Sequence, residues 1–108
     1  MKANEILEGN KLIAEFMGVD VDSYTSYAEE LRKCYSESDL EYHSSWDWLM
    51  PVVDELMALK KCDILIYAKN LVVISYNGET QSYYTMSLIE NVWLAVVELI
   101  KWYNSQNK

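Results

Sequence analysis

Cys34, His43 and Asp47 are the side chains whose types and order could perform a reaction. A thiol nucleophile, an imidazole base and a carboxylate together are typical of a cysteine hydrolase. No glycine-rich turn follows Cys34 to form an oxyanion hole, and its acidic neighbours disfavour the reactive thiolate. The sequence therefore predicts that the protein is not an enzyme, and that His43 is a hydrogen-bonded residue at the start of a helix.

Metal and cofactor sites are not predicted either. Asp20, Asp22 and Ser23 resemble the start of a calcium-binding loop, but the glycine and the closing glutamate that such a loop needs are missing. One histidine and two distant cysteines do not make a closed zinc site. The three glycines lie too far apart to form a phosphate-binding loop.

Tryptophan and tyrosine are unusually frequent, with four and nine residues in a chain of 108. Trp46 and Trp93 are expected on the core faces of their helices. Trp48 lies about 200° around the helix from Trp46, so these two side chains cannot face the same layer. Trp48 is therefore either packed under the preceding Val19–Tyr42 link or exposed for a partner, and Trp102 raises the same question near the end of the chain.

A partner-binding surface is predicted from these aromatic residues and from nearby acids, because buried aromatic side chains dominate many protein interfaces. The predicted residues are Asp47, Trp48, Asp54, Glu55, Leu99 and Trp102.

The charge of −8 is unevenly distributed along the chain. Residues 1–63 contain fourteen acids and six bases, whereas residues 64–108 contain three of each. Such acidity disfavours direct binding to nucleic acid or to anionic lipid. The length predicts one domain over residues 1–108, and no apolar run is long enough to span a membrane. We expect a cytoplasmic protein in which Cys34 and Cys62 are reduced thiols.

Periodic apolar residues predict helices over Asn4–Met17, Ser45–Leu59 and Leu88–Asn104. Gly9 and Asn10 weaken the middle of the first helix. Pro51 fits best if the second helix begins near Met50, after a tighter turn over 44–49; otherwise the helix runs through from Ser45 and Pro51 removes one backbone hydrogen bond.

Three strands are predicted between the second and the last helix, over Ile64–Ala68, Leu71–Tyr76 and Thr80–Thr85. Lys69-Asn70 and Asn77-Gly78 are the candidate two-residue turns, so the strands are antiparallel, with the third at an edge. Ser26 and Glu29 match a capping box, which favours another helix over Ser26–Tyr35. The predicted fold is α+β, a three-stranded antiparallel meander covered by helices (α/β/α sandwich-like), in the order helix–link–helix–β–β–β–helix.

Three blocks of the sequence, Lys11–Gly18, Tyr42–Val53 and Val97–Asn104, resemble small uncharacterised proteins of Bacteroides-type bacteria and their phages. More loosely, the layout is similar to the phage α/β/α-sandwich domain family. The resemblance implies a three-layer α/β/α arrangement and an origin in a phage or mobile element, and it provides no established activity to carry over.

The last helix is apolar around most of its circumference, so it is either packed on two sides or shared with a partner. From this we expect a non-enzymatic protein-interaction module that self-associates, with a possible homodimer through the C-terminal helix and a protein partner of unknown identity. The alternative is an acidic decoy that inhibits a nucleic-acid-binding host protein. Added salt should weaken binding by a decoy steeply, and binding through an aromatic interface much less.

Overall fold

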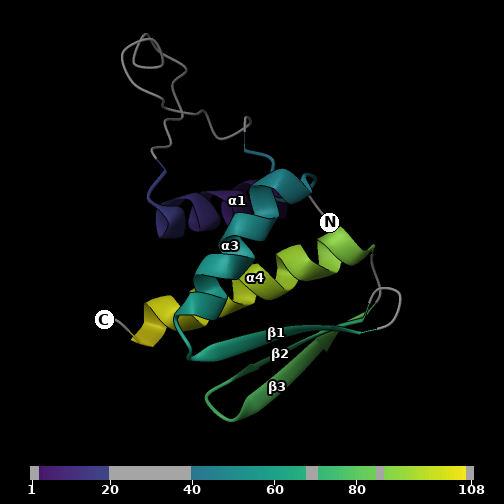
Figure 1. Cartoon of the computed structure of the whole chain (residues 1–108). Helices are drawn as coiled ribbons and strands as arrows, with labels where there is room; N and C mark the ends of the chain where they lie inside the picture. Colours follow the sequence, from purple (N-terminus) through teal and green to yellow (C-terminus); the bar gives the residue numbers. More distant parts are fainter. Residues whose placement is uncertain (1–2, 20–39, 68–70, 85–86, 107–108) are drawn as a thin grey trace, which may run out of the picture.

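The chain folds into helices that pack on an antiparallel sheet, which confirms the predicted α+β class (Figure 1). The computed structural model describes residues 3–19, 40–67, 71–84 and 87–106. The candidate helix over Ser26–Tyr35, the Lys69-Asn70 turn and Cys34 lie outside these residues. The elements in chain order are α1 (Ala3–Met17), α3 (Trp46–Ala58), β1 (Cys62–Tyr67), β2 (Leu71–Tyr76), β3 (Glu79–Tyr83) and α4 (Leu88–Gln106).

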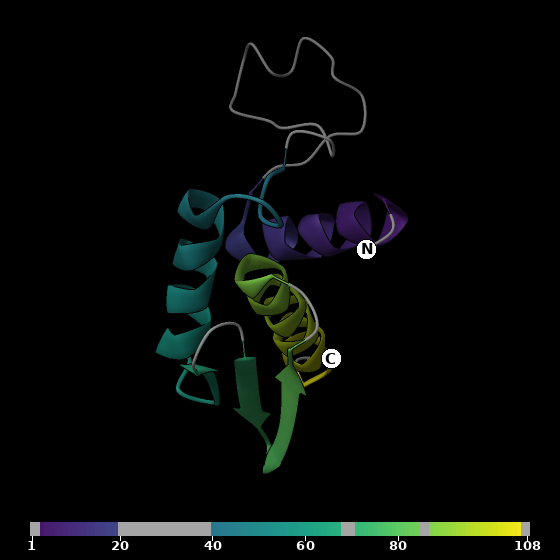
Figure 2. The same cartoon turned by 90° about the vertical axis from the view of Figure 1, so that its right-hand side faces the viewer.

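All three described helices lie on the same side of the sheet (Figure 2). Helix α4 packs on β2 and β3, α3 packs on β1, and α1 packs on α4 at a distance from the strands. Among the described elements the sheet is therefore an outer layer. This differs from the layer order implied by the family resemblance, in which the sheet lies between two helical layers.

Helix α4 begins where the sequence predicts, because a capping box fixes its first turn. The Glu90 backbone N–H donates to Ser87 Oγ at 3.4 Å, and the Ser87 backbone N–H donates to Glu90 Oε1 at 3.4 Å. The helix then continues to Gln106, two residues beyond the predicted end.

Helix α3 runs through Pro51 without a break, so the preferred start near Met50 is wrong. The helix begins at Trp46, after Ser45 in an extended conformation. Pro51 cannot donate the backbone hydrogen bond to the Asp47 carbonyl. Because Asp47 and Pro51 both lie on the exposed side of the helix, that carbonyl can bond to water instead.

The sheet is the predicted meander, with β2 between β1 and β3. Asn77 (φ 52°) and Gly78 (φ 80°) both adopt positive φ, as a two-residue hairpin turn requires, and Tyr76 pairs with Glu79 across it. In the other pair Ile64 lies opposite Ile74, and Leu65 lies opposite Val73. Ile64, Val72 and Ile74 are buried on the side of the sheet that faces the helices.

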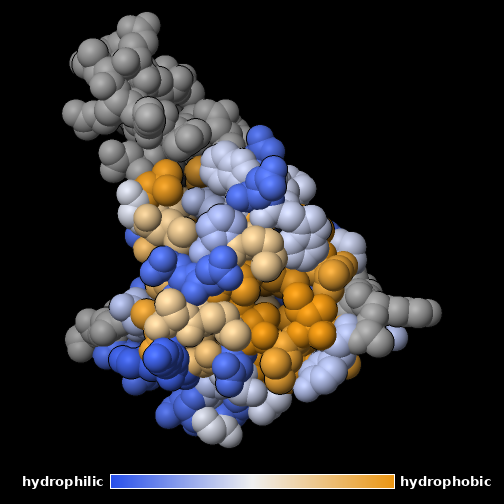
Figure 3. Space-filling model, viewed as in Figure 1, coloured by the Kyte–Doolittle hydropathy of each residue, from blue (hydrophilic) through white to orange (hydrophobic). Residues whose placement is uncertain are grey.

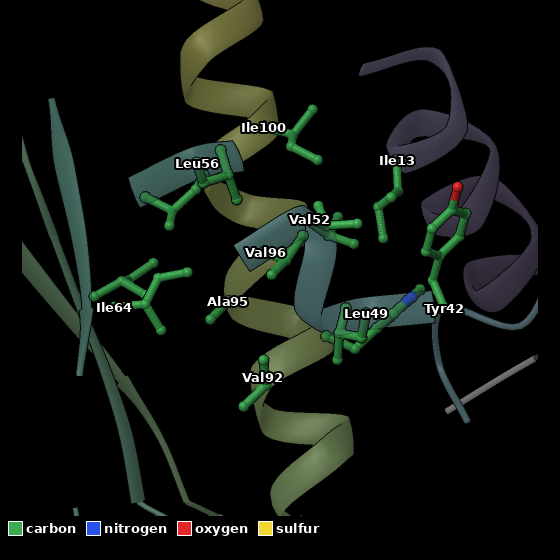
Figure 4. Packing of buried hydrophobic residues seen from close by; sticks show 14 of the residues in the cluster. Ile13, Tyr42, Leu49, Val52, Leu56, Ile64, Val92, Ala95, Val96 and Ile100 are labelled. Atoms are coloured by element: carbon green, nitrogen blue, oxygen red, sulfur yellow. The ribbon is translucent and has the colours of Figure 1, made fainter. Parts of the chain in front are cut away.

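Helix α4 lies in the middle of the core, where it contacts α1, α3 and the sheet. Its apolar residues from Val92 to Ile100 meet side chains of all three neighbours, among them Ile13, Val52 and Ile64 (Figure 4). Of the two explanations for its wide apolar surface, packing on more than one side within the domain accounts for what is observed.

Tyr83 links the edge strand β3 to α4 and makes stability sensitive to alkaline pH. Burial, with smaller effects from Glu98 and Tyr76, raises the pKa of Tyr83 from 10 to about 12. A raised pKa in the folded state stabilises the fold below pH 10, and this stabilisation is lost as the pH rises towards 12. We expect the thermal midpoint of the wild type to fall more steeply between pH 10 and 12 than that of Tyr83→Phe. Equal slopes in circular dichroism melts would contradict this.

Candidate protein-binding surface

An exposed apolar strip runs along one side of α3. Trp46, Met50 and Met57 are 38–39% exposed, although they are large apolar side chains. Their spacing places them within about 40° of one another around the helix, and the half-buried Val53 lies beside them. The core of the domain uses a different side of α3, formed by Leu49, Val52 and Leu56. The strip is thus not needed to close the core.

Trp46 was expected in the core, and this is wrong, whereas Trp93 is buried as predicted. The reason is the helical phase: Trp46 lies about 60–120° around α3 from the buried Leu49, Val52 and Leu56. Leu49 points into the core, so Trp46 is turned towards the strip. Apolar spacing alone cannot resolve the position of Trp46 around the helix, since Trp46 also fits the period of the predicted core face.

Two of the predicted acids border the strip. Asp47 and Asp54 are exposed and lie about 40–100° around α3 from its apolar residues. Helix α3 itself contains no lysine or arginine, and Lys60 and Lys61 follow its C-terminal end. The strip is therefore bordered by negative charge along the helix.

Apolar surface also continues away from α3. Figure 3, viewed as Figure 1, shows it to the right of α3, over the first turns of α4 and the end of β1. The residues of these segments include the half-buried Leu88 and Ile89 of α4 and the exposed Ile66 of β1. Contiguous exposed apolar surface on a folded domain is typical of a binding site.

Trp48 and Glu55 lie on the other side of α3, away from the strip. Trp48 is half-buried and packs edge-to-face on Tyr42, with ring centroids 5.1 Å apart, so of the two alternatives it is the packed one that is observed. Glu55 lines a hollow of about 550 Å³ where α1, α3 and α4 converge. The predicted partner-binding residues therefore do not form one surface.

Leu99 and Trp102 do not belong to an exposed surface of α4. Leu99 is fully buried at 0% exposure, so a glutamate there would disrupt the core rather than separate two subunits, and its assignment to a partner surface is corrected. Trp102 is half-buried against Tyr76, with ring centroids 5.3 Å apart. The homodimer through α4 thus lacks Leu99 as an exposed contact, and the dimer itself stays a prediction.

A buried polar cluster joins α1, α4 and the segment before α3. Trp93 Nε1 donates to Asn10 Oδ1 at 2.8 Å, and Asn10 Nδ2 donates to the Leu40 carbonyl at 3.2 Å. Asn10 Nδ2 also lies 2.9 Å from His43 Nδ1. An indole N–H can only donate, so Trp93 fixes the amide orientation and His43 Nδ1 must be the acceptor. The cluster holds His43 in place, as expected for a hydrogen-bonded residue before α3.

The thiol of Cys62 is the one described cysteine side chain, and it belongs to the core. Cys62 is buried, and its Sγ donates to the Leu56 carbonyl at 3.6 Å. Burial, together with Asp63, raises the pKa of Cys62, which disfavours the thiolate. Within the described residues, no group of three or more His, Cys, Asp or Glu side chains is placed to hold a metal ion. No helix among them is long and apolar enough to cross a membrane.

Comparison of the chain with protein-family models, with curated proteins and with solved structures gives no significant match.

Proposed function

We propose that the protein is a non-enzymatic protein-interaction module, and that its partner binds along the apolar strip of α3. The observation that carries this proposal is the exposure of Trp46, Met50 and Met57 on a helix whose core-facing residues are already buried. Exposed aromatic and methionine side chains in one row are typical of surfaces that bind a partner helix.

The strip has the dimensions of a helix-binding surface. From Trp46 to Met57 it extends over eleven steps along the helix, or about 16 Å at a rise of 1.5 Å per residue. A partner helix with apolar residues at positions i, i+4, i+7 and i+11 covers the same length. Asp47 and Asp54 border the strip, so the complementary partner carries lysine or arginine beside its apolar face.

The surroundings of His43 and Cys62 support a role that is not catalytic. His43 Nδ1 is held by Asn10, and Cys62 is a buried thiol whose ionisation is disfavoured by its surroundings. Neither residue lines the strip. His43 and Cys62 are therefore assigned to the fold and not to the binding surface.

An acidic decoy is the second candidate, and the net charge of −8 is the observation that favours it. In that function the protein would mimic the charge of a nucleic acid and would bind a basic surface through carboxylates spread over α1 and α3. The two functions differ in what the apolar strip contributes. A decoy needs the charge, whereas the helix-binding module needs Trp46, Met50 and Met57.

A peptide titration separates these two functions. The probe is a dye-labelled helical peptide of 18 residues, with leucines on one face and lysines on the other. The comparison peptides replace lysine by glutamate or scramble the order. We expect the leucine–lysine peptide to bind the wild type and to bind Met50→Glu at least tenfold more weakly, as fluorescence anisotropy would measure.

Ala58→Glu is the matched control, because Ala58 is exposed on α3 outside the strip and the charge change is the same. We expect its affinity to stay within twofold of the wild type. A decoy gains attraction for the peptide from the added negative charge, so equal or tighter binding by Met50→Glu would refute the helix-binding proposal. Binding of the leucine–lysine peptide and the scrambled peptide with equal affinity would refute it as well.

A further inference from the structure

We propose that β1 binds β1 of a second copy of this chain, antiparallel and with Leu65 on the two-fold axis, so that two three-stranded sheets join into one of six strands. This inference deepens the self-association included in the expected function and places it on β1 instead of α4. It does not require a partner helix on the α3 strip, but the two interfaces share Met57, the strip residue nearest β1.

The two edges of the sheet differ in a way that points to β1. The edge strand β3 has the sequence Glu79-Thr80-Gln81-Ser82-Tyr83, whose polar residues are typical of an edge that does not pair. β1 instead exposes three large apolar side chains in a row, Leu65, Ile66 and Tyr67, which are 45–51% exposed. The β1 edge carries no proline, and its charged residue, Asp63, lies near the start of the strand.

The backbone groups of the β1 edge are suited to a further strand. The two-residue turn makes Tyr76 and Glu79 a hydrogen-bonded pair, so the backbone groups of Tyr76 and Ile74 point to β3. Ile64 lies opposite Ile74 in the other pair of strands. The N–H and C=O of Ile64, and those of Ile66 two residues on, therefore point away from β2. The Ile64 N–H donates to Met57 Sδ at 3.4 Å, which agrees with this direction. A thioether is a weak acceptor, so a strand carbonyl would serve this N–H better.

The sequence of β1 is complementary to itself in the antiparallel register centred on Leu65. Ile64 lies opposite Ile66 of the second copy, and Leu65 lies opposite Leu65 of the second copy. Asp63 lies opposite Tyr67 of the second copy, so the single carboxylate of the strand meets a phenol rather than another carboxylate. Opposed pairs of this kind stabilise antiparallel strands, whereas like charges would destabilise them.

The same register covers Ile66 and Met57, which are both exposed in the single domain. Ile66 points to the helical side of the sheet, yet α3 packs on the first half of β1, where Met57 contacts Ile64. In the dimer Ile66 of the second copy lies opposite Ile64 and therefore beside Met57. This contact is repeated by the two-fold axis, as expected for an isologous interface. It extends the interface beyond strand pairing, which alone would bury less than the ~1,200 Å² of a stable interface.

Charge does not oppose this arrangement. The excess of acids belongs to residues 1–63, and Asp63 is the last of them. Lys60 and Lys61 immediately precede β1, and the remainder of the chain has three acids and three bases. Two copies can therefore meet at β1 with less repulsion than at α1 or at the acidic side of α3.

The test is the solution mass of the full chain by light scattering and sedimentation over a range of concentrations. We expect a dimer for the wild type and a dissociation constant at least tenfold higher for Leu65→Lys, because two lysines would face each other on the axis. Ser82→Lys is the matched control: it makes the same charge change on the other edge strand, and it should leave the dimer intact. Circular dichroism checks that both variants are folded.

A cross-link tests the register independently of stability. In a Cys34→Ser background, Leu65→Cys should give a covalent dimer under mild oxidation, since Leu65 faces its own copy, whereas Ser82→Cys should not. A wild type that is monomeric at every concentration would overturn the proposal, as would a dimer that Leu65→Lys does not weaken. A monomer that still binds the leucine–lysine peptide would overturn this inference alone, and the proposed α3 surface would stand.

Discussion

Gly9→Ala should destabilise the domain, although alanine is the better helix former. In the middle of a helix this change normally stabilises by about 1 kcal/mol. Here a Cβ on Gly9 would overlap Cζ2 and Cη2 of the buried Trp93 and would lie 3.2 Å from Cγ2 of Val97. Overpacking of a rigid core costs about 1–3 kcal/mol, or more where neither side can move. We expect a net loss of about 2 kcal/mol in the free energy of unfolding, measured by urea denaturation.

The neighbouring exposed position provides the control for this prediction. Glu8→Ala changes the same helix without a core contact and should alter stability by less than about 0.5 kcal/mol. A double-mutant cycle of Gly9→Ala with Trp93→Leu should show a coupling above about 1 kcal/mol, since the smaller side chain removes the overlap. A Gly9→Ala protein that is more stable than the wild type would show that α1 and α4 are not in close contact at this point.

Asn10→Leu should cost about 3 kcal/mol of stability, despite the similar volume of the two side chains. The change removes the acceptor of the Trp93 indole and the donor to the Leu40 carbonyl, both inside the core. Each buried polar group left without a partner costs about 1–3 kcal/mol. Urea denaturation gives the loss, and hydrogen exchange of the Trp93 indole N–H should become faster in the variant.

Asn10→Asp distinguishes the hydrogen bonds of this cluster from its packing. A carboxylate can accept from Trp93 but cannot donate to Leu40 or to His43, and it would be a buried charge. We therefore expect Asn10→Asp to lower the free energy of unfolding, as Asn10→Leu does. Exposed Asn104→Leu should have little effect on stability. A variant with leucine at position 10 that equals the wild type would contradict the role of the cluster.

The elements that could be predicted from the sequence are those with local signals. Ser87 and Glu90 predict the start of α4, and Asn77-Gly78 predicts the hairpin. Both signals can be recognised because the groups that interact are close together in the chain. Gly9 and Asn10 have low helix propensity, so the sequence alone indicates that they weaken α1. Their role depends on Trp93, more than 80 residues away, and no local pattern contains that contact.

The candidate site was only partly predictable for the same reason. Asp47 and Asp54 are exposed on α3 as expected, but Trp46 was assigned to the core and Leu99 to the surface, and the structure reverses both. Apolar periodicity shows that a helix has an apolar side, but the side is about 100° wide or more. Which part of it faces the core depends on where α4 and β1 lie. Ile66 was not singled out, since an apolar residue in a strand is ordinarily assigned to the core.

The central claim, that the strip on α3 binds an apolar and basic helix, is tested most directly by nuclear magnetic resonance. The four indole N–H groups give separate signals in a ¹⁵N-labelled protein, and they can be followed as the leucine–lysine peptide is added. We predict that the signal of Trp46 shifts with the backbone signals of Met50 and Met57, while that of the buried Trp93 stays unchanged. Shifts spread over the acidic residues of α1 and α3, with Trp46 unchanged, would contradict the claim and favour the acidic decoy.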